Sequence, residues 1–557
     1  MKREPSCDAE QLPSKKGNYY WDQYLRPDPV YYPHAIDAKR ALEFNNGKRK
    51  KPYDELQDLI SKQNRPGEDF KTVIHWFRND LRIYDNTGFY TAIKESEKLG
   101  SKILTIYTVN QNDWIAHLES DSKLTMMYRS LKSLHGKLSE MQIPLYVLVF
   151  DSKTLKLSNS KQFVTWLKDE CLKISKSSVY LTANAEYLTD ELYRDIGVFS
   201  VSDERFQFNV FHDPCIVEPG ALKTNQGSQY TVFSPWYKKW CSRVMDGSSP
   251  NNLIEPLVPE KRAYNENEEF VGNTFSYRLP SQYVSSAPIP DASEDAAWSR
   301  LITFLQVSAG GYQDKDLLPT ESSSHLSCYI SLGILSARCV VNEAFKLIGS
   351  RLVGKSPKDM TPVEQFIREV AWRDFYKNII CFWPYLSMDV PFNLSSLEIR
   401  WDNNFSNFQK WCLGNTGFPV VDAIMRKLLQ VGYINNRARM ITASFLSKNL
   451  LIDWRWGEKW FRKHLIDCDL ASNVGGWGFI SSTGADAQPY FRIFNMERQS
   501  RTFDPDGEFI KKWVPELKDS ENVHSSNQEV ENYPSPITDS KSSRQKALEI
   551  YNEGLYG

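Results

Sequence analysis

The sequence lacks the features that mark several common classes of protein. Its nine cysteines include no CxxC pair and its eight histidines show no ligand spacing, so no structural zinc site is predicted. No apolar run approaches the length of a membrane-spanning helix. The net charge of −1 neither predicts nor excludes a nucleic-acid partner, because it hides local basic clusters. The scattered cysteines favour reduced thiols in an intracellular protein.

A glycine-rich GxGxxG loop is also missing after the first predicted strand. Four short runs of β-branched and aromatic residues predict strands, at 72–77, 102–108, 144–150 and 178–184. Apolar residues from Leu124 to Met141 recur three and four positions apart, which predicts a long helix. This alternation predicts an α/β fold with a Rossmann-like parallel sheet, covered by helices on both faces. Because the dinucleotide loop is missing, we expect the sheet to serve another purpose.

The rest of the chain divides by composition. Residues 246–296 are rich in Pro, Ser and Asn, which predicts a long interdomain linker, and the pattern is helical from there to about 517. The polar start of the chain has no sustained periodicity, which is typical of disorder. We therefore expect five segments: a disordered N-terminal extension at 1–68, an α/β domain at 69–200, a connecting segment at 201–300, an all-α domain at 301–520, and a polar tail with a short helix at 521–557.

The N-terminal extension contains a compact basic run, KRKK, at residues 48–51. Such a run is typical of a nuclear-localisation signal, and it is about equally typical of a solvated charged segment. Glu4, Asp8 and Glu10 argue against a mitochondrial presequence, because such presequences are usually poor in acids. We expect a nuclear protein, with a mitochondrial share as the alternative.

Polar and aromatic residues share one face of a predicted helix. Thr361, Pro362 and Glu364 form a helix-start signal, with Glu364 completing a capping box. Four residues of this helix then fall at the spacing of a single face: Glu369, Trp372, Arg373 and Tyr376. A structural face would bury the tryptophan and leave an acid–arginine pair at the surface. A binding face would place an acid, a stacking ring and a guanidinium around one planar ligand.

The stretch from 432 to 477 is the densest mixture of polar groups and aromatics, and nine of the sixteen tryptophans lie between 372 and 513. Asn436 and Arg439 share a face at the start of a predicted helix, and Asp467, Asp469 and Asn473 precede a glycine pair. The two acids could form ion pairs with arginines, or hydrogen-bond the polar edge of a heteroaromatic ring. In the second case the buried charges must be paired, and Arg439 is the expected partner.

A run of hydroxyl side chains, SSSHLS at 322–327, precedes another helix-like segment. Clustered hydroxyls and the amides of a helix N-terminus suit a phosphate or a diphosphate. Serine clusters are more often helix caps and turns, so this run alone does not decide between the two.

Longer motifs resemble one family. They are HWFRNDLRIYDN at 75–86, EVAWRDFY at 369–376, WCLGNTGFPVVDAIMRKL at 411–428, YINNRARMITASFLSKNLLIDWRWGE at 433–458 and DLASNVGGWGFISSTGADAQPYFRIFN at 469–495. The chain resembles the DNA photolyase/cryptochrome family over about residues 70–518, and is most similar to class I cyclobutane pyrimidine dimer photolyases of fungal type. The resemblance implies an antenna-binding α/β domain and an all-α domain that binds FAD and DNA.

The resemblance also implies which residues hold the FAD. Asn473 would lie near the flavin nitrogen whose protonation changes with redox state, and a neutral amide there is typical of dimer photolyases. The chain has Ser-Ser-Ser where the family usually has Gly-Thr-Ser, which retains a hydroxyl. The implied FAD-binding residues are Tyr312, Ser323, Ser324, His325, Leu326, Ser327, Arg373, Asn436, Arg439, Asp467, Cys468, Asp469 and Asn473.

Electron transfer and lesion binding are implied in the same way. Trp401, Trp454 and Trp477 match the family's electron-transfer chain, and Glu369 would hydrogen-bond the lesion. Phe479 replaces a second tryptophan of bacterial relatives. The implied DNA-binding residues are Lys315, Glu369, Trp372, Arg373, Tyr376, Asn436, Arg437, Met440, Phe479 and Gln499. A dimer inside a duplex must be flipped out and stacked on such apolar walls.

The first domain resembles the stretch where a methenyltetrahydrofolate antenna contacts class I enzymes. Asp190 and Glu191 stand in place of a common Asn-Glu pair, and Met388 replaces a lysine of some relatives. We therefore expect a folate antenna as a second cofactor in addition to FAD.

Together these motifs predict light-driven repair of pyrimidine dimers by electron donation from excited, reduced FAD. The expected partner is UV-damaged DNA, single- or double-stranded. We expect the protein to be a monomer that does not associate with a membrane. A cryptochrome photoreceptor is one alternative, and Asn473 and Trp372 argue against it. A (6-4) photolyase is another, although it normally carries a histidine pair where this chain has Asn435 and Asn436. An ordinary flavin redox enzyme would need a substrate pocket that the sequence does not indicate.

Overall fold

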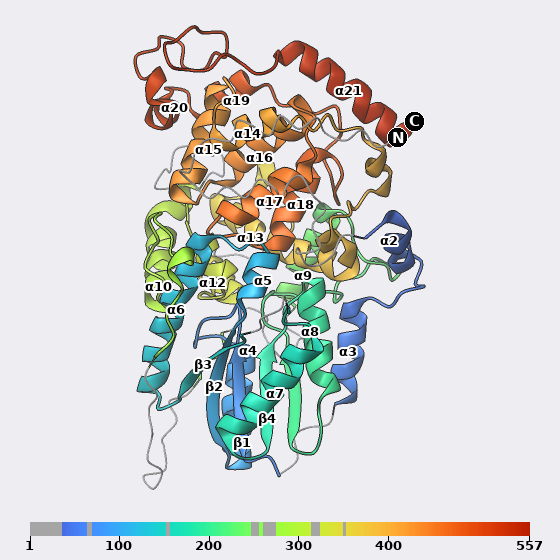
Figure 1. Cartoon of the computed structure of the whole chain (residues 1–557), viewed down its shortest axis with the longest axis vertical. Coiled ribbons are helices and arrows are strands. Elements are labelled where there is room, and N and C mark those ends of the chain that lie inside the picture. Colours follow the sequence, from blue (N-terminus) through green and yellow to red (C-terminus); the bar gives the residue numbers. More distant parts are fainter. Residues whose placement is uncertain are drawn as a thin grey trace.

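The computed structural model describes residues 36–63, 69–151, 156–246, 256–259, 275–312, 323–348 and 352–557. It contains a sheet-and-helix part at one end and a helical part at the other (Figure 1). In these ranges no helix is long and apolar enough to cross a membrane, and no cluster of His, Cys, Asp or Glu is arranged to hold a metal ion. The basic run at 48–51 lies within the described ranges, whereas Lys315 lies outside them.

The sheet has five parallel strands in the order β3-β2-β1-β4-β5. Side chains of the central strand β1 alternate between its two faces. Phe77 packs on Phe89, with ring centres 5.4 Å apart, and Trp76 packs on Phe163 on the other face at 6.3 Å. Burial on both faces is the reason β1 reads as a continuous apolar run. The strands are β1 Thr72–Phe77, β2 Lys102–Val109, β3 Leu145–Val149, β4 Val179–Asn184 and β5 Phe206–Phe211.

Helices cover both faces, as predicted (Figure 1). Phe89 belongs to α4 and Phe163 to α7, so these two helices lie on opposite sides of β1. The long helix predicted from Leu124 to Met141 is α6, which begins slightly earlier because Ser120 caps it. The helices of this part are α4 Thr87–Leu99, α5 Gln111–Ala116, α6 Asp121–Glu140, α7 Lys161–Ser175 and α8 Thr189–Ser200.

The segment at 201–300, predicted to be a connection, contains regular structure. It includes β5, the helix α9 (Phe233–Val244) and the start of α10 (Glu294–Thr303). The α/β region therefore extends past residue 200. β5 is an edge strand whose residues alternate between buried and half-buried, so its polar residues Gln207 and Asn209 interrupt the apolar run that would have marked a strand.

The prediction of disorder over 1–68 is wrong for residues 38–62, which form two helices. They are α2 (Ala38–Asn45), capped by Asp37, and α3 (Pro52–Lys62), which begins with a proline. Each buries a small apolar face, and Tyr53 of α3 packs against Tyr187 and Phe382. These short faces are stabilised by contacts with distant segments, so local composition does not reveal them.

The helical part begins at α10 and confirms the predicted all-α character of this region. Thr361 and Glu364 form the predicted capping box at the start of α13. Its helices are α11 Ser327–Ser331, α12 Ala337–Phe345, α13 Pro362–Phe382, α14 Phe405–Leu413, α15 Pro419–Val431, α16 Asn436–Ser444, α17 Trp454–His464, α18 Leu470–Ser481, α19 Met496–Phe503, α20 Glu508–Trp513 and α21 Ser540–Tyr556.

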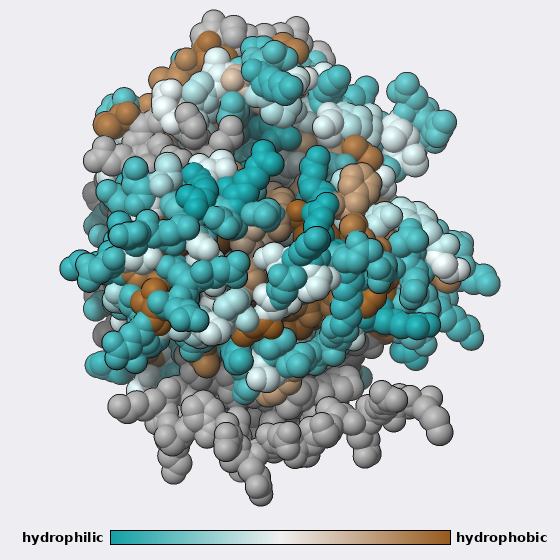
Figure 2. Space-filling view, turned by 90° about the horizontal axis from the view of Figure 1, so that it is seen from above, coloured by the Kyte–Doolittle hydropathy of each residue, from teal (hydrophilic) through white to brown (hydrophobic). Residues whose placement is uncertain are grey.

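The C-terminal helix α21 is longer and better anchored than the short helix predicted for the polar tail. Ala547 and Tyr551 are buried in a small apolar cluster with Ile399 and Leu451. The ring of Tyr551 meets that of Trp401 edge-on, with centres 5.7 Å apart. The tail therefore contributes a packed face, which its many polar residues obscure in the sequence. The face of the molecule seen from above is mostly hydrophilic, with hydrophobic residues gathered in smaller areas (Figure 2).

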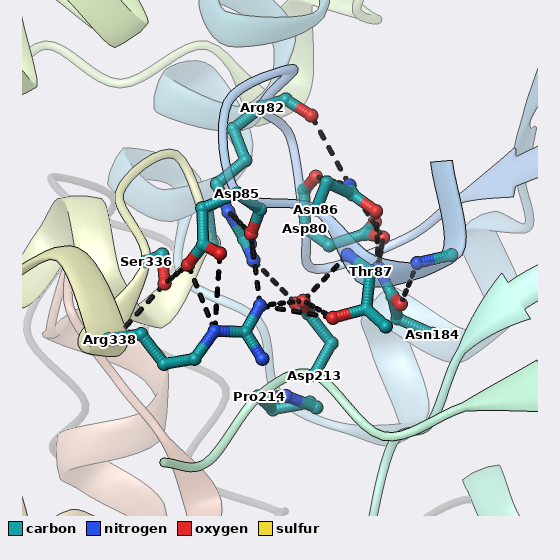
Figure 3. A network of polar contacts seen from close by, with 12 residues as sticks. Asp80, Arg82, Asp85, Asn86, Thr87, Asn184, Asp213, Pro214, Ser336 and Arg338 are labelled. Carbon is teal, nitrogen blue, oxygen red and sulfur yellow. Dashed lines mark hydrogen bonds and ion pairs between the residues drawn. The ribbon is translucent and has the colours of Figure 1, made fainter. Parts of the chain in front are cut away.

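A buried network of charges joins the two parts (Figure 3). Arg338, at the start of α12, donates to Asp85 after β1 at 3.0 Å and to Asp213 after β5 at 2.9 Å. Arg82 pairs with the second oxygen of Asp213 at 2.5 Å, and Ser336 donates to Asp85. Because each of these acids is paired and hydrogen-bonded, the network fixes how the helical part sits on the sheet.

Candidate functional site

The helical part encloses a cavity of about 590 Å³. Its walls come mainly from α13, α16, α18 and the segment that precedes α11, with Lys427 of α15 and Phe461 of α17 among the other lining residues. The structure brings together in this cavity most of the side chains singled out from the sequence: Tyr312, Ser323, Ser324, His325, Leu326, Ser327, Glu369, Trp372, Arg373, Tyr376, Asn436, Arg439, Met440, Asp467, Cys468, Asp469, Asn473, Trp477 and Phe479.

Two of the acids that line the cavity, Asp467 and Asp469, are each paired with a cation. Arg439 donates from one nitrogen to both oxygens of Asp467, at 2.7 and 2.8 Å. Lys377 lies 2.8 Å from Asp469, which also caps α18 by accepting from the backbone N–H of Ser472. Burial raises the pKa of Asp469, but Lys377 and the nearby Arg373 hold it well below its usual range. Both acids are therefore anchored, as a buried polar site requires.

Asn473 lies on α18, but its side chain is held by residues of α17. Its amide nitrogen donates to the side chain of Glu458 at 2.8 Å and to the carbonyl of the same residue at 3.1 Å. Glu458 is itself held by Arg462 at 2.7 Å. Because the amide nitrogen is engaged with α17, the carbonyl oxygen is the group of Asn473 that is left to accept a hydrogen bond in the cavity.

An aromatic wall stands at another side of the cavity. Phe233, from α9, stacks on Trp372 with ring centres 3.6 Å apart and planes 7° apart. Tyr376 stacks on the same indole at 5.3 Å, and Phe479 approaches it edge-on at 6.5 Å. The guanidinium of Arg368 lies 5.0 Å from the centre of the Phe233 ring. This arrangement places Trp372, Tyr376 and Phe479 along one side of the cavity, with Phe233 packed against the indole outside the lining.

The close approach of α13 and α18 shapes the cavity. A Cβ atom at Gly475 would lie 2.2 Å from the ring of Tyr376, so only glycine allows the two helices to meet there. Gly457 plays the same part between α17 and Trp477, where a Cβ would also lie 2.2 Å from the indole. The glycines of this region are therefore packing requirements, which the sequence alone did not assign.

The three tryptophans predicted to carry electrons lie on neighbouring segments. Trp477 lines the cavity and touches α17 at Gly457, one turn from Trp454. The segment after Trp401 is tied to the start of α17, because Asp453 donates its N–H to Asn403 at 2.8 Å. Trp454 and Trp477 are buried and Trp401 is half-buried. This order leads from the cavity outward.

Several predicted residues lie away from this cavity. Arg437 stacks on Phe503 of α19 at 4.6 Å, and Gln499 is also on α19. Asp190 and Glu191 line a second cavity, of about 130 Å³, in the α/β part. Asp190 pairs with His117 at 2.5 Å. Burial, together with neighbouring acids, raises the pKa of Glu191 to about 8.

Sequence reasoning missed several residues of the main site. Arg368, Lys427 and Tyr433 line the cavity, and Phe233 supports the aromatic wall. Arg368 adjoins the predicted Glu369, and Tyr433 lies three positions before the predicted Asn436, so their position along the chain was an available signal. Phe233 lies 139 residues before its partner Trp372, and no local pattern predicts that contact.

Comparison with known proteins agrees with this geometry. Residues 73–257 match the family model described as DNA photolyase, and residues 366–553 match the FAD binding domain of DNA photolyase. The chain is 46% identical to the mitochondrial deoxyribodipyrimidine photo-lyase of Saccharomyces cerevisiae, over the whole of both chains. It is 33% identical to the deoxyribodipyrimidine photo-lyase of Neurospora crassa, over 100% of this chain and 95% of that one.

A solved structure agrees as well. The crystal structure of an archaeal photolyase from Sulfolobus tokodaii, with two FAD molecules, superposes with a TM-score of 0.69 at 26% identity. The superposition covers 86% of this chain and 100% of the archaeal one. The chain therefore belongs to the DNA photolyase family, as its sequence motifs predict.

Proposed function

We propose that this protein repairs cyclobutane pyrimidine dimers in DNA with light, using FAD bound in the main cavity. The observation that carries the proposal is the cavity itself, which combines anchored polar groups with a flat aromatic wall. Bound and reduced FAD would supply, on excitation by light, the electron whose transfer to the dimer lets its two cyclobutane carbon–carbon bonds break, and that electron would then return to the flavin. The protein contributes binding, orientation and electrostatics.

The residues of the cavity fit FAD. Arg373 Nε and Ser327 Oγ are buried and have no hydrogen-bond partner in the described part of the chain, so the cavity offers donors to a ligand. The carbonyl of Asn473 would accept from a protonated ring nitrogen of the flavin. The Arg439–Asp467 ion pair would present polar groups without net charge to the rest of the ring system.

The lesion would lie against the aromatic wall. Trp372, held by Phe233, offers a surface on which a flipped-out dimer can stack, with Phe479 at its side. Glu369 and Met440 line the same cavity, and Glu369 would hydrogen-bond the dimer. Arg437 and Gln499, on neighbouring helices, would contact the DNA around the lesion, so binding should weaken as salt rises.

Trp477, Trp454 and Trp401 would return the flavin to its reduced state. An indole can give up an electron without leaving its packed position. The order of the three segments, from the cavity wall to a half-buried position, supports a path along which each tryptophan is reduced by the next one outward, and Trp401 by a one-electron reductant from solution.

A folate antenna, methenyltetrahydrofolate, would use the second cavity. Asp190 and Glu191 offer carboxyl groups there to the N–H donors of a pterin ring.

For localisation we propose the nucleus together with the mitochondrion. Lys48, Arg49 and Lys50 are exposed between α2 and α3, and the S. cerevisiae relative carries a mitochondrial name.

Illumination of the purified, reduced protein with a dimer-containing oligonucleotide tests the proposal. We expect the intact thymines to be restored in the light and not in the dark, measured by chromatography of the digested DNA. An undamaged oligonucleotide provides the binding control. Lesion binding without restoration of thymines under illumination would contradict the proposal.

A further inference from the structure

Lys427 is a buried cation on the wall of the main cavity. Its side chain comes from α15, and only 6% of the residue is exposed. Its ammonium lies 5.9 Å from the centre of the Tyr433 ring and 5.5 Å from that of Phe509. The charged group that acts on it most strongly is a second cation, Lys512. A buried ammonium without a counterion is costly, unless a bound molecule supplies the negative charge.

Most of the other cations around the cavity are paired with an acid, and Arg373, which forms no ion pair within the described ranges, donates to the carbonyl of Pro214. Arg439 is paired with Asp467, and Lys377 with Asp469. Arg368 lies 3.4 Å from Glu369. These pairs leave little net charge around the part of the cavity bounded by α13, α16 and α18. Lys427, on α15, has no such acidic partner among the described residues.

Around Lys427 the cavity offers donors and positive charge. Arg300 binds the carbonyls of Ser323 and Ser324 at 2.7 and 2.8 Å, so its charge faces this end without meeting a carboxylate there. Ser327 Oγ is buried, and no described residue hydrogen-bonds it. His325 lies against Tyr433, with ring centres 5.4 Å apart. The serine end of the cavity, formed by residues 323–327 and Lys427, is therefore built for an anion.

We propose that Lys427 supplies the counter-charge for the diphosphate of a dinucleotide at the serine end, and that the ligand is retained only while this lysine is protonated. The inference rests on the proposed function, in which the dinucleotide is FAD. It adds a binding residue that the family motifs did not indicate, and it couples retention of the cofactor to a proton.

The geometry around Lys427 determines how pH acts. Burial and Lys512 lower its pKa to about 8 in the protein alone, and an adjacent phosphate would raise it again. Around it lie Lys512 from α20, His325 before α11 and Tyr433 after α15. Burial lowers the pKa of His325 to about 4 and raises that of Tyr433 to about 12. Neither therefore changes charge between about pH 6 and pH 10, where Lys427 does.

The rate of FAD release from the full-length holoprotein, followed by flavin fluorescence, tests this inference. For the unsubstituted protein we expect release to accelerate about 10- to 100-fold between pH 7 and pH 10, the effect of losing one charge-assisted contact. Lys427→Met should release FAD rapidly at both pH values. Lys427→Arg retains the charge at both, so its release should be slow and independent of pH.

Lys448 provides the matched control. It is fully buried, its ammonium also lies 5.9 Å from a tyrosine ring, that of Tyr551, and burial lowers its pKa to about 7. It does not line the cavity but donates to the carbonyl of Arg492 at 2.9 Å. Lys448→Met should therefore release FAD like the unsubstituted protein. Slow release of FAD from Lys427→Met at pH 7, or a release rate of the unsubstituted protein that does not change with pH, would overturn this inference and leave the proposed function intact. A protein that purifies without flavin would overturn the proposed function as well.

Discussion

At the scale of single residues, the aromatic wall depends on Trp372. Its indole is stacked on Phe233 and Tyr376, so it stays flat against the cavity without rearrangement. We expect Trp372→Ala to weaken binding of dimer-containing DNA by about 1–3 kcal/mol, the usual contribution of a stacking ring. Binding to undamaged DNA should change little. Fluorescence anisotropy with both oligonucleotides measures the difference.

Trp166→Ala is the control for that variant. Trp166 packs on Phe150 and Phe163 in the α/β part, outside the cavity. Its loss should cost stability and leave discrimination between damaged and undamaged DNA intact. Equal loss of discrimination in the two variants would argue that Trp372 acts only through folding.

The pair of His117 and Asp190 makes stability depend on pH. Burial lowers the pKa of His117, but Asp190, 2.5 Å away, raises it to about 9 overall. Because this value lies above that of the unfolded chain, the contribution is complete below about pH 6.5 and is lost as pH rises through about 9. Urea unfolding of the protein and of His117→Gln should differ more at pH 7 than at pH 10. An equal difference at both would contradict the assignment.

At the scale of elements, the contact between α13 and α18 requires Gly475. A methyl group there would overlap the ring of Tyr376, so we expect Gly475→Ala to destabilise the fold by about 1–3 kcal/mol, as overpacking does. Gly476 is the neighbouring control, since a Cβ on it meets nothing within 4 Å. Gly476→Ala should leave stability unchanged or raise it by about 0.5–1 kcal/mol. The midpoints of thermal unfolding compare the two, and similar midpoints would contradict this account.

Elements with strong local signals could be predicted from the sequence. The capping box of Thr361 and Glu364 begins α13, and the four apolar runs became β1 to β4. The fifth strand was missed because Gln207 and Asn209 lie on its half-exposed face. The helix α3 was missed because its stability comes from contacts such as Tyr53 with Phe382, which local composition does not record.

At the scale of the whole molecule, the motifs predicted well which residues line the cavity. They predicted less well which other residues hold those side chains in place. The pairing of Arg439 with Asp467 was expected as a condition of burial, and the structure contains it. The stacking of Phe233 under Trp372 joins α9 to α13 and follows only from the tertiary fold. The charge of Lys427 could be read from the sequence, but its lack of an acidic partner among the described residues could not.

The buried network between the two parts gives a prediction at this scale. Arg338→Met would remove the cation that both Asp85 and Asp213 share, and so we expect a loss of about 3–5 kcal/mol in the free energy of unfolding. Lys546→Met breaks an exposed pair with Asp402 and should cost about 0–1 kcal/mol. Denaturant titration of both variants provides the test. A similar small cost for both would show that the network is not needed for stability.

The same network limits which hybrids of this chain and a related sequence can fold. Asp85 follows β1, Asp213 follows β5 and Arg338 opens α12, so the three are far apart in sequence and adjacent in space. A hybrid that took the α/β part from one parent and the helical part from another would bury an unpaired charge wherever the parents differ at these positions. Recombination that leaves a working protein must therefore inherit the three positions together.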